Sequence, residues 1–211
     1  HSIDNVTGLN ISFGVVRIAN IQPCVQVTKY LLEFNWPNHT EVRVMAYHSR
    51  QVLLLRHVQE KHLDKVLKRK EKKDAVPIAF EDAIIRKHID GIFGNQPDVK
   101  NLIFILVATP VEEVGRDHDF DWAIIEPSSY RSIIQLAGRV RRHRSDLICD
   151  PNIGILQYNW RTVKDGDKER KPRFYYPGYE SGPGSGYTKL TNGKHTCFKT
   201  HNVYKLVDVN L

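Results

Sequence analysis

The sequence has no stretch long enough to cross a lipid bilayer and very little cysteine. Its most apolar run is Leu102–Val107, far short of the roughly 20 consecutive apolar residues that a membrane-spanning helix needs. Only three cysteines occur, Cys24, Cys149 and Cys197, and no two of them form a CxxC pair. Cysteines so few and so widely spaced exclude a disulfide-stapled secreted scaffold. We therefore expect a cytoplasmic protein with no membrane partner.

Two segments that enzymes of phosphoryl transfer need are also missing from the sequence. It contains no G-x-x-x-x-G-K-S/T phosphate-binding loop and no D-E-x-H/D metal-binding segment. The nearest approximation to the loop, Gly184–Lys189, is too short and follows no predicted strand. The chain begins with His-Ser rather than methionine, so we interpret it as part of a longer protein. Alone, it is expected not to hydrolyse ATP, because it lacks the groups that hold the phosphates and the magnesium ion.

Basic charge is what the sequence has in excess. Its 31 lysines and arginines outnumber 24 acidic residues, which gives a formal net charge of +7. Such an excess favours a polyanionic partner. Apolar residues make up 41% of the chain and charged residues 26%, a balance that excludes a disordered chain and is typical of a soluble globular one.

Short apolar runs alternate with amphipathic stretches from residue 13 to about residue 157. We expect strands at 15–19, 42–47, 101–108, 122–125 and 153–157, and helices at 23–34, 52–67, 80–91 and after Ser128 or Ser129. This alternation predicts an α/β fold with a doubly wound, mainly parallel sheet over residues 1–157. Residues 158–211 are rich in charge, glycine and proline, which predicts a loop-rich connector and the start of an accessory region, with a strand at 203–209.

Two segments carry the residue types of nucleotide chemistry. Ala108–Asp121 directly follows the most apolar predicted strand, so it lies at the carboxyl end, where open α/β sheets bind ligands. Gln135–Arg144 holds four arginines and no carboxylate, and we expect it on a helix. There Arg139 and Arg142, three positions apart, share a face and converge on one phosphate group. An arginine-rich helix is often only a solvated face, but its ordered pairing with the first segment favours a functional site.

These two segments resemble known helicase motifs. Thr109–Asp121 resembles motif V and Gln135–Arg142 resembles motif VI of superfamily 2 helicases. The fuller pattern is T-x-x-x-E-x-G-x-D-x-D-F-D followed by Q-x-A-G-R-V-x-R-H. It is similar to the corresponding sequence of the CRISPR-associated helicase–nuclease of type I interference, and its residues most resemble those of the subtype I-F form. The resemblance covers about residues 13–157, and it implies that residues 1–157 form the second RecA-like helicase domain.

The resemblance also implies the roles of a nucleotide-binding group. Arg139 and Arg142 are the arginine fingers that reach ATP bound mainly on the preceding domain, and Gln135 positions the γ-phosphate or the attacking water. Asp117, after a glycine in a tight loop, contacts the ribose. The glycines that lie beside the nucleotide are Gly115 and Gly138.

A second group is implied to bind the backbone of single-stranded DNA, and its members are Thr109, His48, Ser49 and Arg50. Two neighbouring positions depart from the family pattern. Pro110 stands where glutamine is common and has no N–H to donate. Arg116 stands at a usually apolar position, which predicts an exposed loop or a direct phosphate contact.

The cofactors implied are ATP and Mg2+, bound mainly by the first RecA-like domain, and a divalent metal for a nuclease domain, both outside this chain. The implied partners are single-stranded DNA, an RNA-guided CRISPR surveillance complex and a CRISPR adaptation protein. The full protein is then expected to unwind and degrade foreign DNA. Two alternatives remain open: a generic superfamily 2 helicase of DNA or RNA, and a non-catalytic basic module that only binds nucleic acid.

Two further signals are interpreted as structural. The basic run Lys68–Lys73 is expected to be a solvated helix end. His195, Cys197 and His201 have the composition of a zinc site but no evident fourth ligand, so we expect no metal there.

Overall fold

The computed structural model describes residues 2–69, 77–113, 117–144, 150–165 and 202–205. Its centre is a six-stranded sheet in which β3, β4, β2, β5 and β6 follow one another in space, all in parallel pairs. The short β1 pairs antiparallel with the start of β2. The strands are β1 Ser2–Ile3, β2 Asn10–Arg17, β3 Thr40–Tyr47, β4 Asn101–Ala108, β5 Trp122–Ile125 and β6 Ile153–Ile155.

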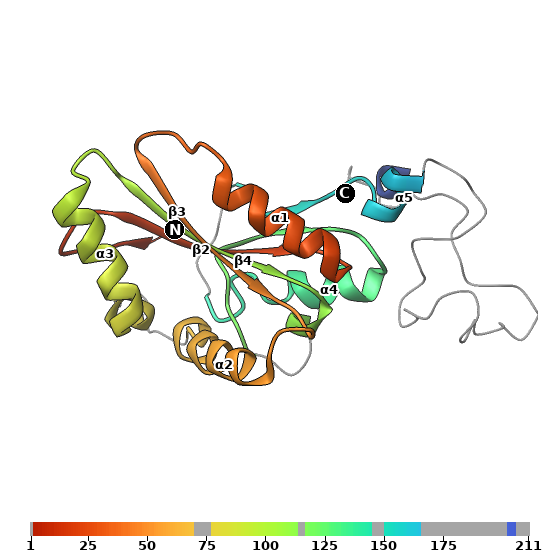
Figure 1. The fold of residues 1–211 in the computed structure, drawn as a ribbon, viewed down its shortest axis with the longest axis horizontal. Helices are drawn as coiled ribbons and strands as arrows, with labels where there is room; N and C mark the ends of the chain where they lie inside the picture. The colour runs from red at the N-terminus through yellow and green to blue at the C-terminus, as the bar shows by residue number, and fades with distance from the viewer. Residues whose placement is uncertain (1, 70–76, 114–116, 145–149, 166–201, 206–211) are drawn as a thin grey trace, which may run out of the picture.

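Helices cover both faces of the sheet, and Figure 1 shows α1 above it and α2 and α3 below it. The α-helices are α1 Ile21–Glu33, α2 Leu53–Leu67, α3 Ala83–Asn95, α4 Tyr130–Ala137 and α5 Trp160–Asp165. The short 3-10 turns are η1 Ile78–Glu81, η2 Pro110–Glu113 and η3 Val203–Lys205. The predicted doubly wound α/β architecture is confirmed.

Successive residues of β4 point to opposite faces of the sheet, and each face has its own core. Leu102 and Leu106 pack in the cluster that includes α2, α3 and α4, whereas Ile105 and Val107 pack against α1. A strand with both faces covered needs apolar residues at every position, which is why this continuous apolar run predicts the bounds of β4 correctly.

The indole ring of Trp122 on β5 lies directly over Gly14 on β2. The two residues are register partners in the parallel pair, and a Cβ on Gly14 would stand 2.0 Å from the ring. The indole Nε1 also donates to Ser12 Oγ at 3.4 Å. Trp122 and Trp36 both pack in the α1 cluster, so these two tryptophans are packing residues.

Several predicted bounds are wrong by a few residues. The first strand runs from Asn10 to Arg17 rather than over 15–19, and the last ends at Ile155. The third helix begins only at Ala83, because the carboxylate of Asp82 accepts hydrogen bonds from the N–H groups of the first turn and the chain before it forms η1.

The segment after residue 157 differs from the expected connector where it is described. It begins with α5, and Val203–Lys205 is a 3-10 turn rather than the start of a strand. Residues 206–211 and 166–201, with Gly184–Lys189, His195, Cys197 and His201, lie outside the described residues. In the described part of the chain, no helix combines the length and the apolar character that a bilayer crossing requires.

Candidate nucleotide and nucleic-acid interface

A buried arginine on β2 anchors the loop that follows β4. Arg17 Nε donates to Glu113 Oε1 at 2.7 Å, at the end of η2. The same guanidinium donates to the carbonyl oxygen of Glu126 at 2.8 Å and to Ser128 Oγ at 2.7 Å. Arg17 is only 1% exposed, so these bonds form away from water, where each is stronger. One side chain therefore holds together the loops that leave β4 and β5.

His118, further along the same loop, lies between two carboxylates. Its Nδ1 contacts Glu112 Oε1, and its Nε2 lies 3.1 Å from Asp64 Oδ1 on α2. Both His118 and Glu112 are completely buried. Each ring nitrogen of His118 has a carboxylate oxygen within hydrogen-bond distance. The contact ties the loop to α2. In the part of the chain with described side chains, no group of three metal-ligating residues forms.

The arginine-rich segment is not on a helix, and this corrects the prediction. Of the two serines expected to cap the helix, Ser128 and Ser129, it is Ser129 that caps α4, but the helix ends at Ala137 and Gly138 is its C-cap. Beyond it, the N–H of Phe120 donates to the Arg139 carbonyl at 2.8 Å, and the N–H of Arg141 donates to the Phe120 carbonyl at 2.9 Å. Arg141 then has φ +51°. Strand-like pairing with Phe120 takes the backbone groups that a longer helix would have used.

Arg139 and Arg142 therefore do not share a helix face, and their environments differ. Arg139 is 6% exposed, and its Nη2 donates to the Glu113 carbonyl at 2.8 Å. Burial lowers the pKa of Arg139, partly opposed by the charge of Glu112. The side chain of Arg142 is 43% exposed, with Nε 3.3 Å from Asp117 Oδ1. The positive charge of Arg142 also lowers the pKa of Arg139.

Asp117 is one of the residues through which the two helicase-like segments contact each other. Besides the Arg142 contact, its Oδ1 lies 2.9 Å from Nε2 of His143. Arg142 and His143 also donate backbone N–H groups to the carboxylate of Asp119, each at 3.2 Å. The structure thus joins Asp117 to Arg142, while the side chain of Arg139 is held by the Glu113 carbonyl on the same loop. Of the remaining predicted members, Gln135 is half-buried on α4, Gly138 ends that helix, and Gly115 lies outside the described residues, as does Arg116.

Asp121, the last residue of the first segment, has a structural role. Its Oδ2 accepts from the N–H of Phe13 at 2.7 Å, and its Oδ1 from Arg69 at 2.8 Å and from Arg144. Burial by itself raises the pKa of Asp121, but the charges of Arg69 and Arg144 outweigh burial and lower it. Arg69 is 3% exposed. The prediction of a solvated helix end is therefore wrong at Arg69, while residues 70–73 lie outside the described part.

Three of the four residues predicted to bind DNA line one cavity of about 610 Å³ at the carboxyl ends of β3 and β4: Thr109, Ser49 and Arg50. The N–H of Thr109 donates to the Tyr47 carbonyl at 3.1 Å, which joins the two strand ends. His48 is not among the lining residues. Its Nδ1 is buried, and burial lowers the pKa of His48.

Sequence reasoning missed two other walls of this cavity. One is the start of α1 at Asn20, and the other is α5, which contributes Trp160, Arg161 and Lys164. On a helix, basic residues three positions apart share a face, so the spacing of Arg161 and Lys164 was the available signal. It falls in a charged segment that resembles an ordinary connector.

Residues 10–145 match the family model for the C-terminal region of the CRISPR-associated nuclease/helicase Cas3. This chain belongs to the Cas3 family. The Cas3 of subtype I-F/YPEST from Pseudomonas aeruginosa is 41% identical over 174 residues, which is 82% of this chain and 15% of that protein. The same protein from Pectobacterium atrosepticum is 39% identical over 184 residues, or 86% of this chain and 16% of that protein. The chain therefore spans about a sixth of the length of these Cas3 relatives.

Two solved structures are also similar to this Cas3 chain. The T. fusca Cas3 complex with ATP has a TM-score of 0.44 and 15% identity, over 70% of this chain and 15% of that one. The complex with AMPPNP has a TM-score of 0.45 and 18% identity, over 69% and 15%. The sequence resemblance to the CRISPR helicase–nuclease, first seen in the segments around Thr109 and Arg139, is confirmed by the family match.

Proposed function

We propose that residues 1–157 are the second RecA-like domain of a Cas3 helicase–nuclease, and that residues 158–211 begin an accessory region. In this proposal the domain supplies the arginine side of an ATPase site whose phosphate-binding loop and Mg2+ ligands lie on another domain. The observation that carries the proposal is the contact of Arg142 with Asp117. It places an exposed guanidinium beside a carboxylate at the carboxyl edge of a parallel sheet, where ligands of open α/β sheets bind.

The two arginines divide the work. Arg142, with 43% of its side chain exposed, reaches the γ-phosphate of a nucleotide held by the facing domain and neutralises charge that develops during its transfer. Arg139, held by the carbonyl of Glu113, keeps the loop at the right distance and adds a second positive charge behind Arg142. Gln135 lies on α4, one helical turn before this pair, and orients the phosphate or the attacking water. When the nucleotide binds, the carboxylate of Asp117 releases its contact with Arg142 and accepts hydrogen bonds from the ribose hydroxyls instead.

The full protein, by this proposal, is an ATP-dependent translocase on single-stranded DNA and a nuclease that degrades foreign DNA in type I CRISPR interference. The names of the relatives from Pseudomonas and Pectobacterium support this activity. ATP and Mg2+ bind between two domains, and a divalent metal serves the nuclease domain. Its proposed partners are the RNA-guided surveillance complex that delivers the DNA and a CRISPR adaptation protein, all in the cytoplasm.

Single-stranded DNA is proposed to bind through Thr109, Ser49 and Arg50, whose cavity lies at the ends of the two neighbouring strands β3 and β4. Closing and reopening of the ATP cleft moves the domains along the strand. Because the proposed contacts are with backbone phosphates, the affinity for single-stranded DNA falls as the salt concentration rises. The backbone of His48 shapes the turn that presents Ser49, because its N–H donates to Gln51 Oε1 at 3.1 Å and its carbonyl accepts from the N–H of Gln51 at 3.3 Å.

The test is ATP turnover of the full-length protein in the presence of single-stranded DNA. Arg142→Ala is expected to lower turnover by roughly 10³-fold or more, by analogy with other arginine fingers. Arg139→Ala is expected to do the same. Arg131→Ala is the matched control, because Arg131 lies on the exposed side of α4. Near-normal turnover in both finger variants contradicts the proposal. Loss of DNA affinity with unchanged turnover identifies instead a module that only binds nucleic acid.

A further inference from the structure

A single buried carboxylate joins the start of α5 to the start of α1. Glu126 is 1% exposed. Its Oε1 accepts from the N–H of Trp160 at 2.6 Å, and its Oε2 accepts from the N–H of Ala19 at 2.6 Å. Asn159 adds a cap, because its Oδ1 accepts from the N–H of Arg161 at 3.0 Å. Although α5 is short, it is therefore anchored to the carboxyl edge of the sheet.

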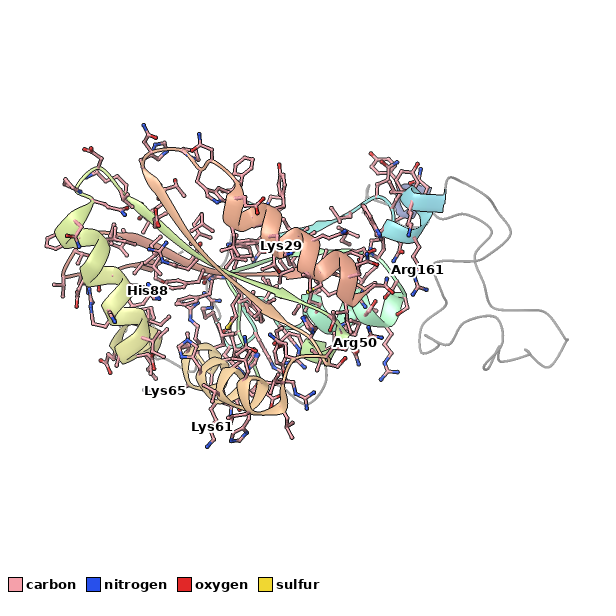
Figure 2. All side chains as sticks on the ribbon, viewed as in Figure 1. Lys29, Arg50, Lys61, Lys65, His88 and Arg161 are labelled. Atoms are coloured by element: carbon pink, nitrogen blue, oxygen red, sulfur yellow. The ribbon has the colours of Figure 1, made fainter. Side chains whose placement is uncertain are left out.

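The anchored helix presents its basic side chains to the cavity that Thr109 and Arg50 line from the other side. Arg161 and Lys164 are three positions apart and face it together. Nη2 of Arg161 donates to Asn20 Oδ1 at 2.6 Å, which holds the guanidinium at the start of α1. Figure 2 shows Arg50 and Arg161 at the same end of the molecule.

The charge of this cavity has one sign. Its described lining residues include three cations, Arg50, Arg161 and Lys164, and no aspartate or glutamate. Cations gathered without carboxylates repel one another unless an anion joins them, and guanidinium groups match phosphate oxygens in geometry as well as in charge. The chemistry of the cavity is therefore that of a phosphate-binding site of about 610 Å³.

We infer that Arg161 and Lys164 bind backbone phosphates of the same DNA single strand that Thr109, Ser49 and Arg50 contact. The inference rests on the proposed function and adds α5, outside the helicase-like segments, as a further element of the DNA grip. Phosphates of a nucleotide are the other source of the same chemistry. The residues proposed for the nucleotide, Asp117 and Arg142, do not line this cavity, which favours the DNA strand.

The experiment measures the affinity of the full-length protein for a fluorescent oligo(dT) strand over a range of salt concentrations, without nucleotide. The double variant Arg161→Gln/Lys164→Gln is expected to bind several-fold more weakly. Its plot of log affinity against log salt becomes shallower by about 1.4, because each phosphate contact on a single strand contributes about 0.7. The charge-conserving Arg161→Lys/Lys164→Arg variant is expected to keep the wild-type slope. Lys29→Gln, on the exposed side of α1 (Figure 2), is the control for loss of charge and is expected to change neither quantity.

Three results overturn the inference, and they are distinguishable. Unchanged affinity and slope in the α5 double variant, with weaker binding by Arg50→Gln, remove α5 from the site and leave the proposed function intact. Unchanged binding in both variants removes the proposed DNA site as well. A raised KM for ATP in the α5 double variant, with DNA affinity unchanged, assigns the cavity to the phosphates of the nucleotide. The unfolding temperature of the α5 double variant shows whether the variant folds normally. It is expected to equal that of the wild type, because the side chains of Arg161 and Lys164 are exposed.

Discussion

The guanidinium of Arg17 and the carboxylate of Glu113 form a buried ion pair between residues that are 96 positions apart, with 2.7 Å between Nε and Oε1. Their side chains are 1% and 3% exposed. Arg17 is the register partner of Ala108, the last residue of β4. It therefore stands next to the point where the chain leaves the sheet toward η2. The pair sets the position of the loop that carries Asp117 and supports Arg139.

Removing one partner of this pair is expected to cost far more than removing both. Arg17→Met removes the buried guanidinium that faces the Glu113 carboxylate, and removing one partner of a buried ion pair costs about 3–5 kcal/mol. The double variant Arg17→Met/Glu113→Leu is expected to recover a large part of that loss. The free energy of urea unfolding of the three proteins checks this. A loss below about 1 kcal/mol in Arg17→Met, as in exposed ion pairs, would show that the pair is not buried in solution.

His118 is expected to contribute to stability through Glu112 rather than through Asp64. His118→Leu leaves the fully buried Glu112 carboxylate without its partner, which predicts a loss of about 3–5 kcal/mol. Asp64→Asn, the control, removes a carboxylate whose side chain is 37% exposed and is expected to cost about 1 kcal/mol or less. Hydrogen exchange at the amide of Glu112 reports the local opening. Equal losses in the two variants contradict this division.

Asp121 is expected to make stability fall in acid. Its folded-state pKa lies below the ordinary value of 3.8, because the charges of Arg69 and Arg144 outweigh burial. A lowered pKa contributes stability that is present above 3.8 and is lost as the pH falls from 3.8 toward the folded-state value. Asp121→Asn is expected to be less stable near neutral pH and to lose less stability over that acid range. Unfolding measured at a series of pH values checks this, and parallel curves for the two proteins would contradict it.

Adding one methyl group is expected to have opposite effects at two glycines. Gly14→Ala forces a Cβ to within 2.0 Å of the Trp122 ring, and overpacking of this kind costs about 1–3 kcal/mol or more. Gly91→Ala, inside α3, meets nothing within 4 Å and is expected to stabilise by about 0.5–1 kcal/mol. Thermal unfolding of both variants is the measurement. A Gly14→Ala variant as stable as the wild type would show that the ring is free to move away.

The elements that sequence reasoning placed correctly have their cause inside the segment. The strand Asn101–Ala108 was predicted with correct bounds because apolar residues at nearly every position suit burial on two faces. A cap of α4 at Ser128 or Ser129 was predicted because serine is a preferred N-cap residue, and in the structure Ser129 accepts from the N–H of Ser132, three residues on. Thr109, His48, Ser49 and Arg50 were expected at one DNA site. Three of them line one cavity, because parallel strands end at the same edge, and His48 does not line it.

The predictions that failed depended on a partner far away in the chain. Arg139 and Arg142 were placed on a helix because local spacing favours one, but pairing with Phe120 ends the helix at Ala137. Arg69 was expected in solvent because it follows a lysine in a basic run, whereas it is buried beside Asp121. The basic pair on α5 was missed because contacts with distant residues, among them the buried carboxylate of Glu126, bring it to the cavity.

The amino-acid order alone determined the α/β class, the family and the two segments proposed to carry its chemistry, because periodicity and short motifs are local properties. Which arginine is exposed and which is buried, and that α5 closes the cavity of Thr109, were decided only by the folded chain. The reason is physical: burial, ion pairing and competition for backbone hydrogen bonds depend on groups that meet only when distant segments pack together.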